Sequence, residues 1–371
     1  SHSTNKMPEV CGIICPQDRL CEGNCVIEKS GHGTVTIGSI EKYITDTAWE
    51  KGWVKPIKVR RELKQSIGII GAGPAGMACA EELRKSGYQV TIYDRYDRPG
   101  GLLIYGIPNF KLEKFVVERR TKLLKESGIK FVQNFDAGKD KTLYELKEEH
   151  DAILIATGVY KAREIDIPGH NLQNIFPAME FLTASNRKGL GDKVKLFDNG
   201  TLNAHGKDVV VIGGGDTAAE EATYLSNICS KVTMLVRKDE MRASKAMQHR
   251  VNSKENIDLK YNSEVVEVLG DNVVEGLKII NNKTQKTEEI NITGFFVAIG
   301  HKPNTDLFRG QLDMDKTGYI ITNGKTTKTN IPGVFASGDV QDKEYRQAVT
   351  AAGTGCMAAL DAERYLASIG D

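Results

Sequence analysis

The chain has 371 residues, which is long enough for two or three domains with sizeable cores. Apolar residues make up 40% of it and charged residues 27%, as in ordinary globular proteins, and a net charge of +1 gives no reason to expect nucleic acid or an anionic membrane as a partner. No apolar run is long enough to cross a membrane and no signal-peptide pattern is visible, so we expect a cytoplasmic protein without a membrane partner.

Four of the seven cysteines crowd into the first part of the chain, at Cys11, Cys15, Cys21 and Cys25. An odd total argues against a disulfide framework. Four thiols this close together can ligate an iron–sulfur cluster or a zinc ion, and Pro16 suits a loop that wraps a metal. The alternative is a set of reduced thiols in a small, loop-rich cap.

A helix is predicted to begin near Ser39, because apolar residues recur there at helical spacing. Its apolar face consists of Ile40, Tyr43, Ile44 and Thr47. We expect this face to pack against the next domain, with Trp49 and Trp53 as packing anchors. The basic run from Lys58 to Lys64 is predicted to be a polar linker.

Residues 66–94 carry the strongest signal in the chain: an apolar strand, a glycine-rich turn, a helix and a second strand that ends at Asp94. In this pattern Gly71 permits the tight turn, Gly73 lets the backbone approach a pyrophosphate, and Gly76 lets the helix pack closely on the sheet. The helix start, with Pro74 and Ala75, offers free N–H groups to phosphates. Asp94 lies at the distance expected of a carboxylate that binds an adenosine ribose. We predict a dinucleotide site here; the alternative is a glycine-rich turn without a ligand.

Three later stretches are predicted to complete this first site as an FAD site. Gly101 is the second residue of a glycine pair, and Leu102 follows it; paired glycines beside apolar residues suit backbone wrapped around a flat flavin. After a helix over residues 111–127 and strands over 129–133 and 152–155, the small residues Thr157 and Gly158 would let the chain pass close to the dinucleotide.

The last of these stretches is Gly338-Asp339 and the following helix, which starts near Gln347 and Ala348. Asp339 could accept a bond from a ribityl hydroxyl, or it could be a helix N-cap. The positive end of the helix near Gln347 would lie against the N1 and O2 edge of the flavin and favour its anionic reduced form.

Residues 207–242 repeat the opening plan, with strands over 208–212 and 231–236 and a helix over 219–226. The predicted phosphate turn contains Gly213, Gly215, Asp216 and Thr217. Where the first unit ends in an acid, this one ends in Arg237 and Lys238, with Arg242 one turn beyond. Cations there can neutralise a 2′-phosphate, so we predict NADPH rather than NADH. The alternative is a solvated basic helix start.

The remaining chain predicts an antiparallel meander followed by a buried strand over 294–300. The strands of the meander are predicted over 257–260, 265–269, 273–280 and 287–292, with a turn at Asn281-Asn282. The predicted fold is α/β, with two Rossmann-like dinucleotide-binding domains and a small, Cys-rich helical cap. The predicted domains are the cap (1–62), the first part of the FAD domain (63–165), the NADPH domain (166–298) and the second part of the FAD domain (299–371).

These stretches resemble flavoproteins with two dinucleotide-binding domains, and two families among them. Residues 7 to about 215 resemble the small (beta) subunit of bacterial NADPH-dependent glutamate synthase. This resemblance rests on Cys11–Cys25, Gly38–Ile44, Gly100–Pro108 and Phe110–Leu112. Residues from about 209 to 366 resemble bacterial thioredoxin reductase. That resemblance rests on Gly213–Thr217, Glu220–Asn227, Arg242–Lys245, Phe296–His301, Gly338–Val340, Tyr345–Ala348 and Ala352–Asp361. The simplest interpretation is an engineered hybrid, joined at the glycine turn that both families share.

The sequence departs from both families. Residues 186–208 contain no cysteine, so the Cys-x-x-Cys of thioredoxin reductases is absent there and we predict that thioredoxin reductase activity is absent too. The glutamate synthase resemblance implies cluster ligation by Cys15, Cys21 and Cys25, with Glu41 near a second cluster. That family carries further cysteines in a longer N-terminal region. A [4Fe-4S] cluster with Cys11 as fourth ligand and incomplete ligation therefore both stay open.

Together these features predict an FAD-dependent oxidoreductase that accepts hydride from NADPH and passes electrons to an unknown acceptor. Positioning and flavin electronics would carry the catalysis, so we assign no catalytic side chain. One alternative is a folded FAD-binding scaffold with little turnover. Another is an electron-transfer subunit that needs an iron–sulfur cluster and a partner. Both resemblances suggest assembly, and a homodimer is one form it could take.

Overall fold

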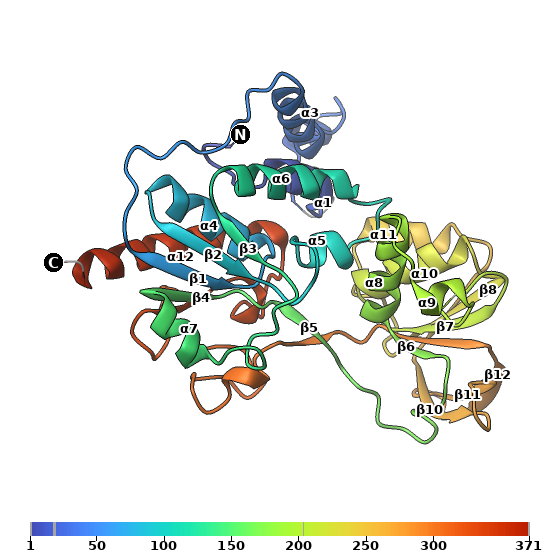
Figure 1. The fold of residues 1–371 in the computed structure, drawn as a ribbon. Helices are drawn as coiled ribbons and strands as arrows, with labels where there is room; N and C mark the ends of the chain where they lie inside the picture. Colours follow the sequence, from blue (N-terminus) through green and yellow to red (C-terminus); the bar gives the residue numbers. More distant parts are fainter. Residues whose placement is uncertain (1, 18–19, 203, 370–371) are drawn as a thin grey trace. The chain divides into compact units, whose positions relative to one another are not determined.

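The structure is a computed structural model that describes residues 2–17, 20–202 and 204–369 (Figure 1). The chain divides into two compact units. The first contains Ser1–Gln17, Cys25–Lys161 and Lys302–Asp371, and the second contains Asp18–Asn24 and Ala162–His301. Strands β5 (Val159–Ala162) and β14 (His301–Pro303) pair where the chain passes from one unit to the other.

Within the described residues, no helix has the length and apolar character that crossing a membrane requires.

The first unit is built on a parallel sheet of five strands in the order β15-β4-β1-β2-β3. These strands are β1 (Ser66–Ile70), β2 (Gln89–Tyr93), β3 (Lys130–Val132), β4 (Ala152–Ile155) and β15 (Val334–Ala336). Four of the five β1 residues and all of β4 are buried, and such continuous apolar strands are typical of a sheet covered on both faces.

Helices α4 (Pro74–Lys85) and α12 (Ala348–Ile369) pack against each other beside this sheet (Figure 1). Their backbones come close at Gly355, where a Cβ would lie only 2.3 Å from the Ala75 carbonyl oxygen. The unit also contains α5 (Leu102–Tyr105), α6 (Lys114–Glu126), α7 (Leu143–Glu149) and the 3-10 turns η1 (Asp306–Phe308) and η2 (Gly338–Val340). The helix that was predicted over 111–127 begins at Lys114, three residues later than predicted.

The N-terminal cap consists of α1 (Pro8–Ile14), α2 (Val26–Lys29) and α3 (Ile37–Glu50). A buried ion pair ties α1 to the domain beneath it. The guanidinium of Arg120, on α6, donates to both carboxylate oxygens of Glu9 at 2.6 and 2.9 Å, and to Glu81 on α4 at 2.9 Å. Arg120 is only 2% exposed, so all three charges depend on one another.

The prediction for the helix near Ser39 was wrong about its buried face. Ile40, Tyr43 and Ile44 are 48%, 73% and 51% exposed, and the buried residues of α3 are Gly38 and Thr45. The reason is a backbone contact that hydrophobic periodicity does not record. A Cβ on Gly12 would lie 2.8 Å from the Gly38 carbonyl oxygen, so α1 and α3 touch through glycines instead of apolar side chains.

The two tryptophans of this region also differ from each other. Trp53 is 70% exposed, so it is not the packing anchor that we predicted. The Trp49 ring is half-buried and lies 5.1 Å from the Arg119 guanidinium and 5.9 Å from that of Arg120. Trp49 thus covers the buried ion pair through cation–π contacts.

The second unit contains a parallel sheet in the order β6-β13-β7-β8-β9. Its strands are β6 (Ile175–Pro177), β7 (Asp208–Ile212), β8 (Lys231–Val236), β9 (Ile257–Tyr261) and β13 (Gly294–Val297). Its helices are α8 (Ala178–Gly189), α9 (Lys195–Asp198), α10 (Asp216–Ser226) and α11 (Lys245–Asn252). The helix that was predicted over 219–226 begins at Asp216, three residues earlier than predicted.

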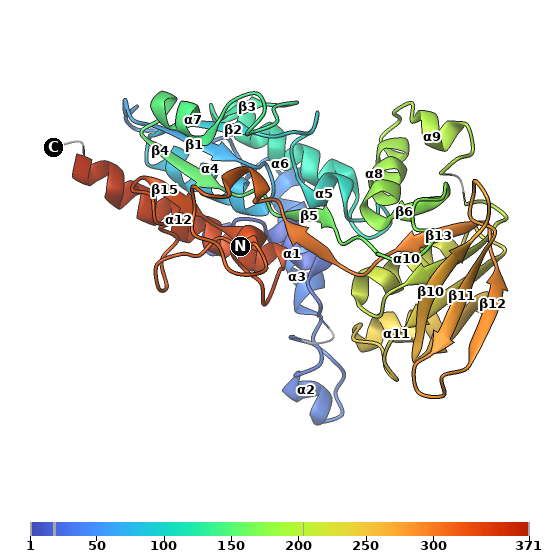
Figure 2. The same ribbon diagram turned by 90° about the horizontal axis from the view of Figure 1, so that it is seen from below.

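Three antiparallel strands, β10 (Ser263–Leu269), β11 (Gly276–Asn281) and β12 (Thr287–Asn291), lie side by side in this unit (Figure 2). The predicted meander had a fourth strand, residues 257–260, which is instead the parallel edge strand β9. The connection explains the difference, because α11 lies between β8 and β9 and a crossover through a helix produces parallel pairing.

Candidate cofactor sites

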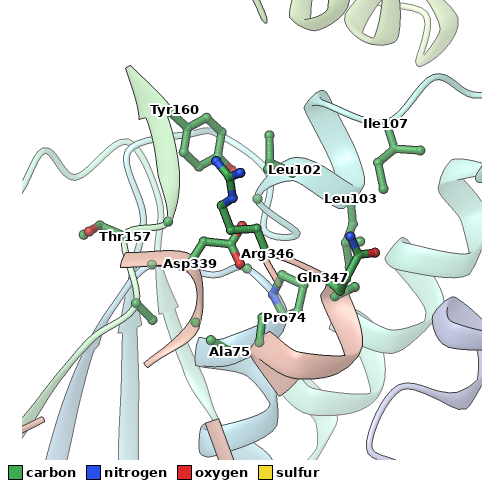
Figure 3. A pocket seen from close by; sticks show the side chains of 18 of the residues that line it. Pro74, Ala75, Leu102, Leu103, Ile107, Thr157, Tyr160, Asp339, Arg346 and Gln347 are labelled. Carbon is green, nitrogen blue, oxygen red and sulfur yellow. The ribbon is translucent and has the colours of Figure 1, made fainter. Parts of the chain in front are cut away.

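A cavity of about 250 Å³ in the first unit gathers most of the residues predicted to bind FAD (Figure 3). Thirteen of the fourteen line it: Gly71, Gly73, Pro74, Ala75, Asp94, Gly101, Leu102, Thr157, Gly158, Gly338, Asp339, Gln347 and Ala348. The exception is Gly76, whose Cβ would lie 2.0 Å from the Gly71 carbonyl oxygen. Gly76 therefore supports close packing of α4 and does not border the cavity.

The turn between β1 and α4 leaves room for a ligand at one glycine only. Gly71 has φ +114°, and a Cβ there would lie 2.2 Å from the Ala156 carbonyl oxygen. A Cβ on Gly73 would meet nothing within 4 Å, so the backbone at Gly73 borders open space. Among the described residues no side chain caps α4 at Gly73. This arrangement fits a pyrophosphate at the start of α4.

Asp94 is held by the backbone of the same turn. One carboxylate oxygen accepts a bond from the Ala72 N–H at 2.7 Å and the other from the Tyr96 N–H at 2.9 Å. Burial raises the pKa of Asp94, and these two amides oppose the rise. Each carboxylate oxygen has further lone pairs, so the group can still accept bonds from ribose hydroxyls.

A second, smaller hollow adjoins Asp94. The Arg95 guanidinium lies 5.0 Å from the ring centre of Tyr96 and 4.8 Å from that of Tyr160, and all three residues line this hollow. The aromatic rings of Tyr93 and Phe135 line it as well. The hollow therefore suits a flat, aromatic part of a ligand.

Asp339 lies in η2 and lines the main cavity. Burial raises its pKa to about 6, with Asp342 adding to the rise and Arg346 opposing it. Asp339 is not the N-cap of the last helix, because α12 begins nine residues later, at Ala348; Asp342 orders the loop that precedes this helix. Asp342 accepts bonds from the N–H groups of Glu344 at 2.9 Å, Tyr345 at 3.0 Å and Arg346 at 3.1 Å.

Sequence reasoning missed several residues of this cavity. Arg346 has φ +48°, an uncommon conformation for a side chain of its size, and Figure 3 shows it beside Asp339 and Tyr160. Ile14, from the cap helix α1, also lines the cavity. Arg346 lies in the stretch Tyr345–Ala348 that resembles thioredoxin reductase, and this signal could have identified it. Its backbone angle, and the contact that Ile14 makes from another part of the fold, depend on tertiary structure.

Lys114 binds the backbone of a turn that lines the cavity. It is 5% exposed, and its ammonium donates to the carbonyl oxygens of Leu103, at 3.0 Å, and Ile107. Burial lowers its pKa to about 8. Because Leu102, Leu103 and Ile107 all line the cavity, Lys114 fixes the turn that forms one of its walls.

The second glycine turn, in the other unit, repeats the geometry of the first. Gly213 has φ +142°, and a Cβ there would lie 2.4 Å from the Ala298 carbonyl oxygen, whereas a Cβ on Gly215 would meet nothing within 4 Å. Asp216 and Thr217 begin α10, and among the described residues no side chain caps this helix at Gly215.

The basic residues after β8 lie on a loop that folds against this turn. The Gly214 carbonyl oxygen accepts bonds from the N–H groups of Arg242 at 2.6 Å and Ala243 at 3.0 Å. Arg237, Lys238 and Arg242 are exposed at the carboxyl end of β8. That end corresponds to the position of Asp94 in the first unit, so cations stand where the other site has an acid. The arrangement fits a 2′-phosphate.

The four N-terminal cysteines do not form a metal centre in this structure. Cys11 is buried and hydrogen-bonds to Cys15 one turn later, which raises the pKa of Cys11 and lowers that of Cys15. The Cys25 thiol accepts a bond from the Val35 N–H at 3.5 Å, and Cys21 is a half-buried free thiol. Nowhere in the described part of the chain do three or more His, Cys, Asp or Glu side chains gather as ligands. In the described residues the four thiols do not converge on one point, and we assign no step to a cluster.

Comparison with known proteins agrees with this geometry. Residues 65–355 match the family described as pyridine nucleotide-disulphide oxidoreductase. The chain belongs to this family. FAD and NADPH are accordingly its cofactors, and the predicted two-dinucleotide fold is confirmed. Residues 1–53 match the family described as dihydropyrimidine dehydrogenase domain II, 4Fe-4S cluster, which supports the Cys-rich cap as a possible cluster domain.

Individual proteins show both predicted resemblances. The glutamate synthase [NADPH] small chain of Azospirillum brasilense is 48% identical over 361 residues, covering 92% of this chain and 75% of the relative. A thioredoxin reductase of Dictyostelium discoideum is 38% identical over 327 residues, covering 82% of this chain and 98% of the relative. A crystal structure of Lactococcus lactis thioredoxin reductase superposes with a TM-score of 0.66 at 28% identity, covering 82% of this chain and all of that one.

These matches do not support the idea of an engineered hybrid. The match to one small chain covers 92% of the sequence, so it runs through the proposed junction at 209–218. The match to one thioredoxin reductase covers 82% of the chain, which is far more than the residues from about 209 onward, so this resemblance also extends across the proposed junction.

Proposed function

We propose that this oxidoreductase takes hydride from NADPH at the second glycine turn and passes electrons from FAD to a separate acceptor. The observation that carries the proposal is the opposite charge at two equivalent positions. One glycine turn is followed by Asp94, the other by Arg237 and Lys238. When bound, FAD supplies hydride acceptance and release of electrons singly or in pairs. The chain itself supplies selective binding and orientation of the two cofactors.

Each group of residues has a proposed role. The turn around Gly73 holds the FAD pyrophosphate, and Asp94 accepts bonds from the adenosine ribose. Asp339 accepts a bond from the ribityl chain, and the start of α12 at Gln347 and Ala348 directs its positive end toward the flavin N1 and O2 edge. The buried position of Asp94 supports the proposal, because a low dielectric strengthens the hydrogen bonds that its carboxylate accepts.

Arg237, Lys238 and Arg242 hold the 2′-phosphate of NADPH in this proposal. Changing both Arg237 and Lys238 to Ala should raise the KM for NADPH about 10- to 100-fold, because two charge-assisted hydrogen bonds are lost, and should leave the KM for NADH nearly unchanged. Ferricyanide reduction by the FAD-loaded protein measures both constants. Lys286→Ala, an exposed cation on the hairpin loop, is the matched control. An equal change for both nucleotides would contradict the assignment.

For the acceptor, the proposal excludes thioredoxin, because the Cys-x-x-Cys of thioredoxin reductases is missing from residues 186–208. A thioredoxin-coupled assay with NADPH should give no rate above background. The relative from Azospirillum brasilense is named a small chain, and we extend that role to this protein: its electrons go to a group on a second, larger chain. Iron and sulfide analysis then decides whether a cluster takes part in the transfer.

The alternative of an FAD-binding scaffold with little turnover predicts a different outcome in the same assay. A yellow, folded protein that does not reduce ferricyanide with NADPH would favour the scaffold over the oxidoreductase.

A further inference from the structure

The segment that connects the cap to β1 is strongly basic. Residues 55–64 contain Lys55, Lys58, Arg60, Arg61 and Lys64 against a single acid, Glu62. The whole chain carries a net charge of only +1, so this local excess is not a general property of the protein. It also lies outside both cofactor sites.

This segment forms the wall of a hollow of about 380 Å³ in the first unit. Lys58, Arg60 and Arg61 line the hollow together with Lys85, at the end of α4. Lys85 is neutralised by Glu81 at 2.7 Å and Glu82 at 2.9 Å. The other three cations make no ion pair with any described residue.

The acid of the segment does not neutralise them. Glu62 accepts bonds from both terminal nitrogens of Arg84, one of them at 2.7 Å, so its charge is already compensated. Three cations thus surround one concave surface without a counter-charge from the protein. A cleft lined by one sign of charge concentrates ions of the opposite sign.

The backbone on both sides of the hollow is fixed. At one end the Ile57 N–H donates to the Ser127 hydroxyl at 2.9 Å, and at the other the Leu63 N–H donates to the Gly87 carbonyl oxygen at 2.9 Å. A ligand therefore needs to order only the side chains, which lowers the entropic cost of binding.

We propose that this hollow binds a compact, multivalent oxyanion of the phosphate type. Guanidinium groups match the geometry of phosphate oxygens, and Arg60 and Arg61 supply two of them beside the ammonium of Lys58. The ligand is either free pyrophosphate or the diphosphate end of a nucleotide. Binding ties the segment between cap and β1 to the end of α4.

The experiment is calorimetric titration of the FAD-loaded protein with inorganic pyrophosphate, and separately with ADP, in the presence of saturating NADP⁺. Because FAD and NADP⁺ then occupy both cofactor sites, the added anion cannot bind to the glycine turns there. Saturable binding at one site per chain is expected. Tighter binding of pyrophosphate identifies a free anion as ligand, and tighter binding of ADP identifies a nucleotide that also uses the aliphatic side chains of Ile57 and Leu63.

Arg60→Gln combined with Arg61→Gln should weaken pyrophosphate binding about 25-fold, since each exposed cation in contact with the anion is worth roughly fivefold. These side chains have no partner among the described residues, so FAD content should stay unchanged. The control replaces Lys316 and Lys325, two exposed lysines outside the hollow, by Gln and should bind as the parent does.

A second readout is cleavage of the segment by trypsin, which cuts after lysine and arginine. Pyrophosphate should slow cleavage after Lys58 in the parent protein and in the lysine control. Absence of saturable binding, or equal binding by the double arginine variant, would overturn the proposal. Neither result would affect the assigned cofactor sites, because they share no residue with the hollow.

Discussion

Glu221 gives the sharpest test of the packing in the second unit. It lies on α10 one helical turn from Ala218 and Leu225, is 2% exposed, and has no hydrogen-bond partner for either carboxylate oxygen among the described residues. Burial, assisted by Glu220, raises its pKa from 4.5 to about 8. The carboxyl is therefore expected to be protonated in the folded protein at neutral pH.

The sign of the resulting pH dependence follows from proton linkage. Between pH 4.5 and 8 the folded chain holds a proton that the unfolded chain has released, so stability falls as pH rises through this range. Each unit of pKa difference is worth about 1.4 kcal/mol, which gives an upper limit of about 5 kcal/mol for the loss. In Glu221→Gln the side chain cannot ionise, and this loss should disappear.

The assay is the difference in unfolding free energy between Glu221→Gln and the parent, measured in urea at several pH values between 4.5 and 8.5. The variant should gain stability relative to the parent with rising pH, up to about 5 kcal/mol. Glu289→Gln, an exposed carboxyl on β12, controls for loss of one negative charge. A difference that stays constant with pH would refute the reasoning.

Three further predictions concern the first unit. Lys114→Met should weaken FAD binding about 10- to 100-fold, because two carbonyl oxygens lose a buried donor; flavin fluorescence on dilution measures it, with exposed Lys122→Met as control. Arg120→Met should cost about 3–5 kcal/mol in urea unfolding, because Glu9 is left charged and buried, and an unchanged midpoint would argue against the ion pair. Gly71→Ala should abolish FAD retention, since its Cβ would lie 2.2 Å from a carbonyl oxygen; a yellow variant would contradict the turn geometry.

The parts of the fold that could be predicted are those whose physics is local. Strands β1 and β7 are continuous apolar runs that end in glycine turns, and both glycine turns form where the sequence indicates. The charge at the end of the second strand, acidic at Asp94 and basic at Arg237, is likewise visible in the sequence.

The rest depended on contacts between distant segments. The buried face of α3 could not be predicted, because Gly12 and Gly38 bring two backbones together without an apolar pattern. The sequence also gave no sign that Lys114 is buried, because a lysine is usually exposed and its two carbonyl acceptors come from a turn fixed by tertiary packing. The left-handed conformation of Arg346 has the same origin.

The most direct test of the central claim is anaerobic titration of the FAD-loaded protein with NADPH, followed through the flavin absorption band. The account predicts that the band bleaches with one NADPH per FAD, and that NADH is far less effective at equal concentration. Protein that is isolated colourless and does not take up added FAD, or that keeps its flavin band in excess NADPH, would contradict it.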